Sequence, residues 1–195
     1  MLAAPGAVLR FAPLMLVSGC IVPFATPPMR GEVGAASQSS APTTVHVAVG
    51  THVASATMSG GQRFDLGLGY LFEPAGDATT QGAYFDVAWF TERLERTRTS
   101  LGMRNELRWT AMGQGFASKL RIDTELFSAG SAKFEGDDSC GTMAGNRYGT
   151  AAIGLYAEAG RAWMPEGGSG WIATAGITAR LPSTVGVWIG IPWCK

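Results

Sequence analysis

Apolar and polar side chains alternate with period two from about residue 45 to the end of the chain. Turn residues such as Ser59-Gly60-Gly61 and Pro182-Ser183 separate the alternating segments. Alternation of this kind is typical of strands with two different faces, whereas a helix repeats every 3.6 residues. We expect eight strands, at 45–55, 63–72, 82–91, 97–109, 115–127, 150–163, 170–181 and 184–193. The pattern predicts an all-β fold, a single up-and-down antiparallel β-barrel of about eight strands.

One face of these strands carries nearly all of their charge. Thirteen of their fourteen charged residues share that face with all twelve glycines, and only Arg161 lies on the apolar face. Seven of the thirteen are basic and six are acidic, so ions enclosed in a barrel could pair with one another. Glycine weakens a strand that faces water, whereas on the concave side of a tight barrel it relieves crowding. We therefore predict that the charged face points inward and the apolar face outward.

The predicted interior contains a network of charges from several strands. Its members are Arg63, Asp65, Arg104, Glu106, Arg108, Lys119, Arg121, Asp123, Glu125, Glu158 and Arg180. Residues 104–108 and 119–125 belong to consecutive strands joined by a short turn, so their side chains should meet across a hairpin. An eight-stranded barrel is just wide enough for side chains to fill. The prediction is a lumen filled by paired charges rather than an open pore, with a polar pathway or a small anionic ligand site as alternatives.

A short apolar run near the N-terminus ends at Leu16-Val17-Ser18-Gly19-Cys20. The run is far shorter than the ~20 apolar residues of a membrane-spanning helix, which indicates a signal segment. Its last five residues resemble a bacterial lipobox, in which the cysteine is lipidated and becomes the first residue of the mature chain. The resemblance implies a signal peptide at 1–19 and a lipid on Cys20.

The next segment, residues 20–43, shows no apolar period and contains four prolines among many Ala, Ser and Gly residues. Such a composition is typical of flexible linkers. We predict a flexible, lipidated N-terminal tether at 20–43, followed by a β-barrel domain at 44–195.

Residues 44–193 resemble the small eight-stranded outer-membrane barrels of Gram-negative envelopes. The resemblance depends on the alternation and on aromatic residues near strand ends of the apolar face, namely Tyr70, Phe72, Trp89, Trp109, Trp163, Trp171 and Trp193. Amphipathic rings at such positions favour a membrane interface. The resemblance implies an outer-membrane location with lipid around the barrel. The chain departs from it at Trp193-Cys194-Lys195, because such barrels usually end on an aromatic residue.

Cys140 and Cys194 form a candidate disulfide pair, since a signal segment implies an oxidising compartment. With the eight strands above, the loop 128–149 is extracellular and the C-terminus periplasmic, which puts these cysteines at opposite rims. A disulfide needs Cα atoms within about 7 Å. Either the bond does not form, or an additional crossing exists near Ala132–Gly136, or the body is not a simple spanning barrel.

The composition excludes several classes of function. The net charge is zero, so no basic patch predicts nucleic-acid binding. No CxxC, HExxH or Cys/His cluster is present in the sequence, and we expect neither a metal nor a cofactor. His46 and His52 face the predicted interior by parity. We interpret them as lumen-filling histidines bonded to carboxylates, with general-base catalysis as the alternative.

These observations predict an outer-membrane lipoprotein that is not an enzyme. Its small barrel would have a structural or surface-recognition role and would contact membrane lipid through Cys20 and the barrel exterior. The alternative is a lipid-anchored soluble periplasmic barrel that binds an apolar ligand inside.

Overall fold

The computed structural model describes residues 20–39, 41–52, 64–76, 79–91, 97–129, 132–138, 141–148, 151–164 and 168–190. They form twelve β-strands: β1 (Cys20–Thr26), β2 (Met29–Gln38), β3 (Ala41–His52), β4 (Phe64–Glu73), β5 (Thr80–Phe90), β6 (Arg98–Thr110), β7 (Gly113–Ala129), β8 (Ala132–Asp138), β9 (Gly141–Tyr148), β10 (Ala151–Met164), β11 (Gly168–Leu181) and β12 (Ser183–Gly190). No helix long and apolar enough to cross a membrane occurs among these residues.

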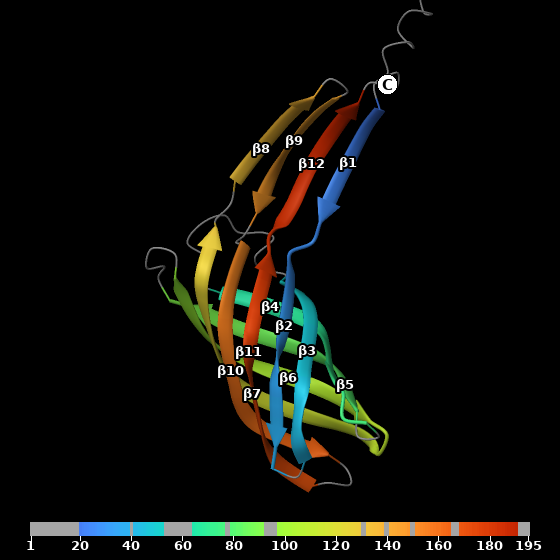
Figure 1. The fold of residues 1–195 in the computed structure, drawn as a ribbon, viewed down its shortest axis with the longest axis vertical. Helices are drawn as coiled ribbons and strands as arrows, with labels where there is room; N and C mark the ends of the chain where they lie inside the picture. The colour runs from blue at the N-terminus through green and yellow to red at the C-terminus, as the bar shows by residue number, and fades with distance from the viewer. Residues whose placement is uncertain are drawn as a thin grey trace, which may run out of the picture.

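Eight of the strands close into an antiparallel barrel, in the order β10-β11-β2-β3-β4-β5-β6-β7 (Figure 1). The prediction of an all-β, up-and-down barrel of eight strands is therefore confirmed. Strands β2 and β11 complete the ring through a continuous antiparallel ladder from Met29–Leu181 to Gln38–Ile172. Closure leaves the barrel wall without a free edge.

The wall alternates as the sequence predicts. On β6 and β7, Arg104 and Lys119 are buried, while Leu101 and Leu120 on the opposite face of the same two strands are 63% and 67% exposed. Arg161, the one charge on the apolar face, is exposed as well. The charged face thus points inward and the apolar face outward, because a ring of eight strands encloses the side chains of every second residue.

The other four strands form a separate sheet beyond one end of the barrel, in the order β1-β12-β9-β8 (Figure 1). We call these four strands the extension sheet. They follow or precede β2, β11, β10 and β7 in the chain, so the sheet prolongs one side of the barrel wall in the same strand order. β1 and β8 are its edge strands.

Three expectations from the sequence are wrong. The segment 20–43, expected to be a flexible tether, contains β1 and β2, and β2 is a full member of the barrel. The expected last barrel strand, 184–193, corresponds to β12, which belongs to the extension sheet. The expected loop 128–149 contains the hairpin of β8 and β9. Proline, glycine and alanine hide the short alternation of β1, β2 and β9. The alternation of β12 is clear, but alternation alone does not say which strands pair.

These changes bring the ends of the chain and the expected loop to the same end of the barrel. Cys20 is paired with Gly190, and Gly190 is paired with Gly141. The expectation that the segment 128–149 and the end of the last strand lie at opposite rims is thus also wrong. The candidate disulfide residues Cys140 and Cys194 themselves lie outside the described residues.

Candidate functional site: the charged interior

The barrel interior is a single network of ion pairs. Its buried members are six cations (Arg30, Arg104, Arg108, Lys119, Arg121 and Arg180) and eight carboxylates (Glu32, Asp65, Glu73, Asp86, Glu106, Asp123, Glu125 and Glu158). Each of these cations lies within 4.0 Å of at least one of the carboxylates, and each carboxylate lies within 4.0 Å of at least one of the cations. A buried ion is tolerated only when it is paired, so this pairing is a condition for the barrel to fold.

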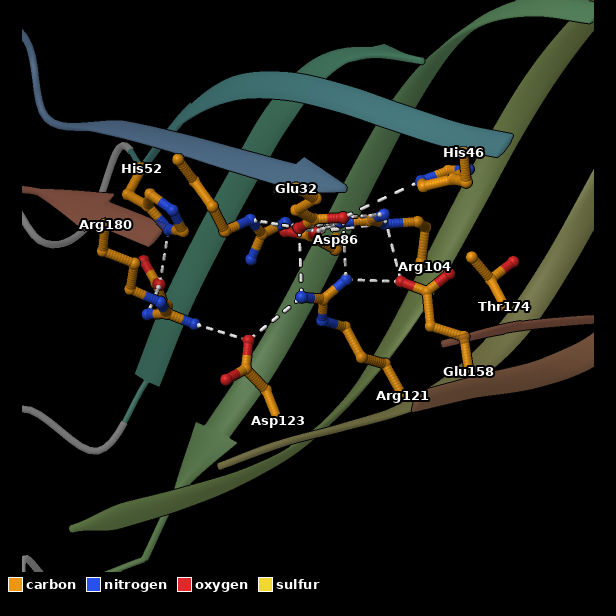
Figure 2. A network of polar contacts seen from close by, with 12 residues as sticks. Glu32, His46, His52, Asp86, Arg104, Arg121, Asp123, Glu158, Thr174 and Arg180 are labelled. Atoms are coloured by element: carbon orange, nitrogen blue, oxygen red, sulfur yellow. Dashed lines mark hydrogen bonds and ion pairs between the residues drawn. The ribbon is translucent and has the colours of Figure 1, made fainter. Parts of the chain in front are cut away.

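Arg104 is the centre of the network. Its Nη1 and Nη2 donate to the two carboxylate oxygens of Glu32 at 2.8 and 2.9 Å, and Nη2 also donates to Asp86 at 2.7 Å. Nη1 lies 3.0 Å from Glu158. Figure 2 shows these carboxylates converging on the guanidinium from different strands. The planar fork of arginine suits this arrangement, because its donors can serve several carboxylates at once.

Aromatic rings complete the surroundings of these guanidinium groups. The Arg104 guanidinium lies 4.0 Å from the ring centre of Tyr84, and that of Arg121 lies 4.5 Å from the ring centre of Tyr156. Both rings are buried and point into the interior. Each ring supplies a cation–π contact and fills space that would otherwise admit water.

Two further residues connect this centre to neighbouring strands. Arg121 pairs with Glu158 and lies 3.0 Å from both Glu32 and Asp123. Lys119 pairs with Glu106 and lies 2.6 Å from Glu158. Arg104 and Lys119 are direct partners in the β6–β7 ladder, so the prediction of charges meeting across this hairpin is confirmed.

A histidine lies at each end of the network. His52 Nδ1 is 2.6 Å from Asp65 Oδ2, and Arg180 Nη1 donates to the same oxygen at 3.1 Å. At the other end, His46 Nδ1 is 2.9 Å from Glu73 Oε1, while Arg108 pairs with the other oxygen of Glu73. Both histidines are buried and bonded to carboxylates, as the sequence analysis expected.

Interior glycines make room for these groups. A Cβ atom at Gly67 would overlap the carboxylate of Asp86, and one at Gly69 would overlap the ring of Tyr84. A larger residue at either position would displace a member of the network or a ring that covers it. The concentration of glycine on the charged face thus reflects crowding inside the barrel.

Ten of the eleven predicted network residues lie in this interior, namely Asp65, Arg104, Glu106, Arg108, Lys119, Arg121, Asp123, Glu125, Glu158 and Arg180. The eleventh, Arg63, lies outside the described residues. The sequence analysis left out Arg30, Glu32 and Glu73, and it counted Asp86 on the charged face without including it in the network. Arg30 and Glu32 carried a usable signal, because they are two residues apart, between outward-facing Met29 and Val33, on a segment taken for a tether.

Paired ions fill the interior of the barrel and occupy the space that an open pore would need. Within the described ranges, no group of three or more His, Cys, Asp or Glu side chains is arranged to hold a metal ion.

The outer wall is the second distinctive surface. Large apolar side chains are exposed on every strand of the barrel, among them Val33, Val47, Leu68, Phe85, Leu101, Leu120, Leu155 and Ile177. A soluble domain would cover such a surface, since contiguous exposed apolar patches on soluble proteins seldom exceed a few hundred Å².

Comparisons of the chain with protein families, with curated proteins and with solved structures find no match.

Proposed function

We propose that this protein is a lipoprotein of the Gram-negative outer membrane whose barrel is inserted in the bilayer. The observation that carries the proposal is the inverted polarity of the barrel, with paired charges inside and exposed apolar side chains outside. In a bilayer the apolar wall meets lipid tails, and the closed ladder satisfies the backbone polar groups. The role is structural and non-catalytic, since the interior is fully occupied by its own ion pairs.

The alternative of a soluble barrel with an apolar ligand inside has no observation in its favour. That function needs an apolar interior wall, whereas the described interior is dominated by carboxylates, guanidinium groups and one ammonium group. It would also leave Leu68, Leu101, Leu120 and their neighbours in water.

Replacing Cys20 by alanine separates the lipid anchor from the inserted barrel. We expect a palmitate analogue to label the wild-type protein and not Cys20→Ala, because the cysteine thiol accepts the lipid. We also expect Cys20→Ala to remain in the membrane fraction after a carbonate or urea wash, because the apolar wall holds the barrel without the lipid.

The two readouts test different parts of the proposal. Equal labelling of both proteins would show that the lipid is not attached to Cys20. Release of the unlabelled variant by the wash would show that the lipid alone held the protein, which would contradict insertion of the barrel.

The proposed lipid on Cys20 indicates which rim of the barrel faces the periplasm. Cys20 begins β1, so a lipid in the periplasmic leaflet directs the extension sheet to the periplasm. The opposite rim, formed by connections such as 74–79 and 111–112, then faces outside. Those connections are short, so they offer little surface for recognition outside the cell. A periplasm-facing structural role therefore fits this arrangement better than surface recognition.

Lys133, on β8 of the extension sheet, reports this orientation. It is exposed, whereas Lys119 in the barrel interior is 1% exposed and serves as an internal control. We expect a membrane-impermeant amine reagent to modify Lys133 only after the outer membrane is permeabilised, as measured by peptide mapping. Modification of Lys133 in intact cells would instead put the extension sheet outside and restore the surface-recognition role.

A further inference from the structure

The four strands of the extension sheet differ sharply in charge. β1 and β12 contain no charged residue, β9 contains only Arg147, and β8 contains Lys133, Glu135, Asp137 and Asp138. Because the strand order is β1-β12-β9-β8, charge rises steadily from one edge of the sheet to the other. We call the pair β1 and β12 the apolar half of the sheet.

The apolar half is exposed. Ile21 is 65% exposed, and Val185 and Ile189 are each 47% exposed. They lie at odd-numbered positions, the same parity that faces outward on β2 and β11. A shallow groove of about 600 Å³ crosses this face and is lined by residues of all four strands. Its apolar side is formed by β1 and β12, and its charged side by Lys133 and Glu135.

The edges of the sheet are poor templates for another strand. β1 contains Pro23, which has no N–H to donate, and β8 alternates charged residues along its length. Proline and charges on edge strands prevent pairing with a further chain. A partner of this sheet therefore has to contact its apolar face, because the edges do not favour the addition of another strand.

If Cys20 carries the lipid proposed above, its position in the sheet indicates that partner. Cys20 is the first residue of β1 and is already paired with Gly190, so no spacer separates it from the sheet. Seven residues of strand span about 23 Å, which is the reach of β1 from the barrel rim. If the sheet stood upright on an inserted barrel, acyl chains on Cys20 would hang in water at that height. Exposed acyl chains are strongly unfavourable, so the lipid has to draw this corner of the sheet to the bilayer.

The β-ladder is interrupted between the pairs Met29–Leu181 and Thr26–Thr184, so the sheet does not have to follow the direction of the barrel wall. The strands of the apolar half are separated from their barrel strands by Pro27-Pro28 and by Pro182. Barrel strands also tilt by about 35–45° from the membrane normal, so a sheet that continues them already leans to one side.

We infer that the apolar half of the extension sheet lies on the lipid surface of the membrane that holds the barrel, while β8 stays in water. This inference rests on the proposed function, since it needs both the inserted barrel and the lipid on Cys20. It makes the extension sheet a second membrane contact, in which Ile21, Val185 and Ile189 meet the interfacial region of the leaflet.

The structure offers a matched pair of positions for the test. Val187 on β12 and Glu135 on β8 are both partners of Ala144, so they lie in one cross-strand row and on one face. They differ in their distance from β1. The lipidated protein with Cys140→Ser and Cys194→Ser would carry a fluorophore on either Val187→Cys or Glu135→Cys, in vesicles whose lipids bear a quencher near the headgroup.

We expect the quencher to lower emission from position 187 at least about twofold more than from position 135, because an interfacial apolar surface lies about 5–10 Å deep in the headgroup region. Equal quenching at the two positions, or none at 187, would overturn the inference. If quenching at position 187 fell as the protein concentration rose, the inference would also be overturned, because a second copy of the protein would then cover the face.

A third label distinguishes this failure from failure of the proposed function. Leu120→Cys lies on the barrel wall, where the native side chain is 67% exposed. A quencher deep in the acyl chains should reach position 120 whenever the barrel is inserted, whatever the extension sheet does. A sample without an introduced cysteine checks the lipid, because a lipidated Cys20 has no free thiol to label.

Discussion

Replacing Arg104 with methionine is expected to lower the free energy of unfolding by about 3–5 kcal/mol, because removal of one partner leaves buried ions uncompensated. Arg104 is fully buried and neutralises Glu32, Asp86 and Glu158 at once. Arg30, Lys119 and Arg121 still contact these carboxylates, but none of them replaces the donors that Arg104 directs to Glu32. Urea titration of the protein refolded in lipid vesicles, followed by tryptophan fluorescence, measures the change.

Arg161→Met is the matched control. Arg161 is exposed, and its guanidinium lies 6.0 Å from the ring centre of Trp171. An exposed cation–π contact contributes about 0.5–1 kcal/mol, so the control should cost far less than Arg104→Met. Equal losses for Arg104→Met and Arg161→Met would mean that the interior pairs do not hold the barrel together.

Leu68→Arg should cost about 2–4 kcal/mol in a bilayer, because an arginine on the lipid face of a barrel is most unfavourable at the membrane midplane. Leu68 faces outward near the middle of β4, and its ladder partner Phe85 lies at the middle of β5. The same titration in vesicles gives the change in the free energy of unfolding.

The control for depth is Leu181→Arg. Leu181 is also apolar and exposed, but it ends β11 at the rim of the barrel. Near the interface an arginine costs only about 0–1 kcal/mol. If Leu68→Arg proves as harmless as Leu181→Arg, the wall meets water, and insertion of the barrel is wrong.

The sequence was sufficient for the inward and outward faces of seven of the eight wall strands, all except β2. Alternation on β6 and β7 predicts which side chains face inward, because successive residues of a strand point to opposite sides. Glycine on the charged face indicates which side is concave, as Gly67 and Gly69 illustrate beside Asp86 and Tyr84. Most of the interior network follows from these two rules alone.

The sequence did not predict which strands pair with one another. β12 alternates as regularly as any barrel strand, yet it pairs with β1 and β9 in the extension sheet. Alternation is a local property of one strand, whereas partners are decided by contacts between distant segments. β2 was missed because Gly, Ala and Ser dilute its pattern, and Arg30 and Glu32 of the network were missed with it.

The extension sheet has a consequence for how the ring is completed. The barrel closes along a seam between β2 and β11, which join the N-terminal and C-terminal parts of the chain. The ladder of β1 and β12 lengthens that seam by seven further residue pairs, from Thr26–Thr184 to Cys20–Gly190. Joining distant segments is entropically costly and slow, so a longer seam gives more contacts to offset that cost. The ladder of β1 and β12 beyond the rim therefore also stabilises the closed ring.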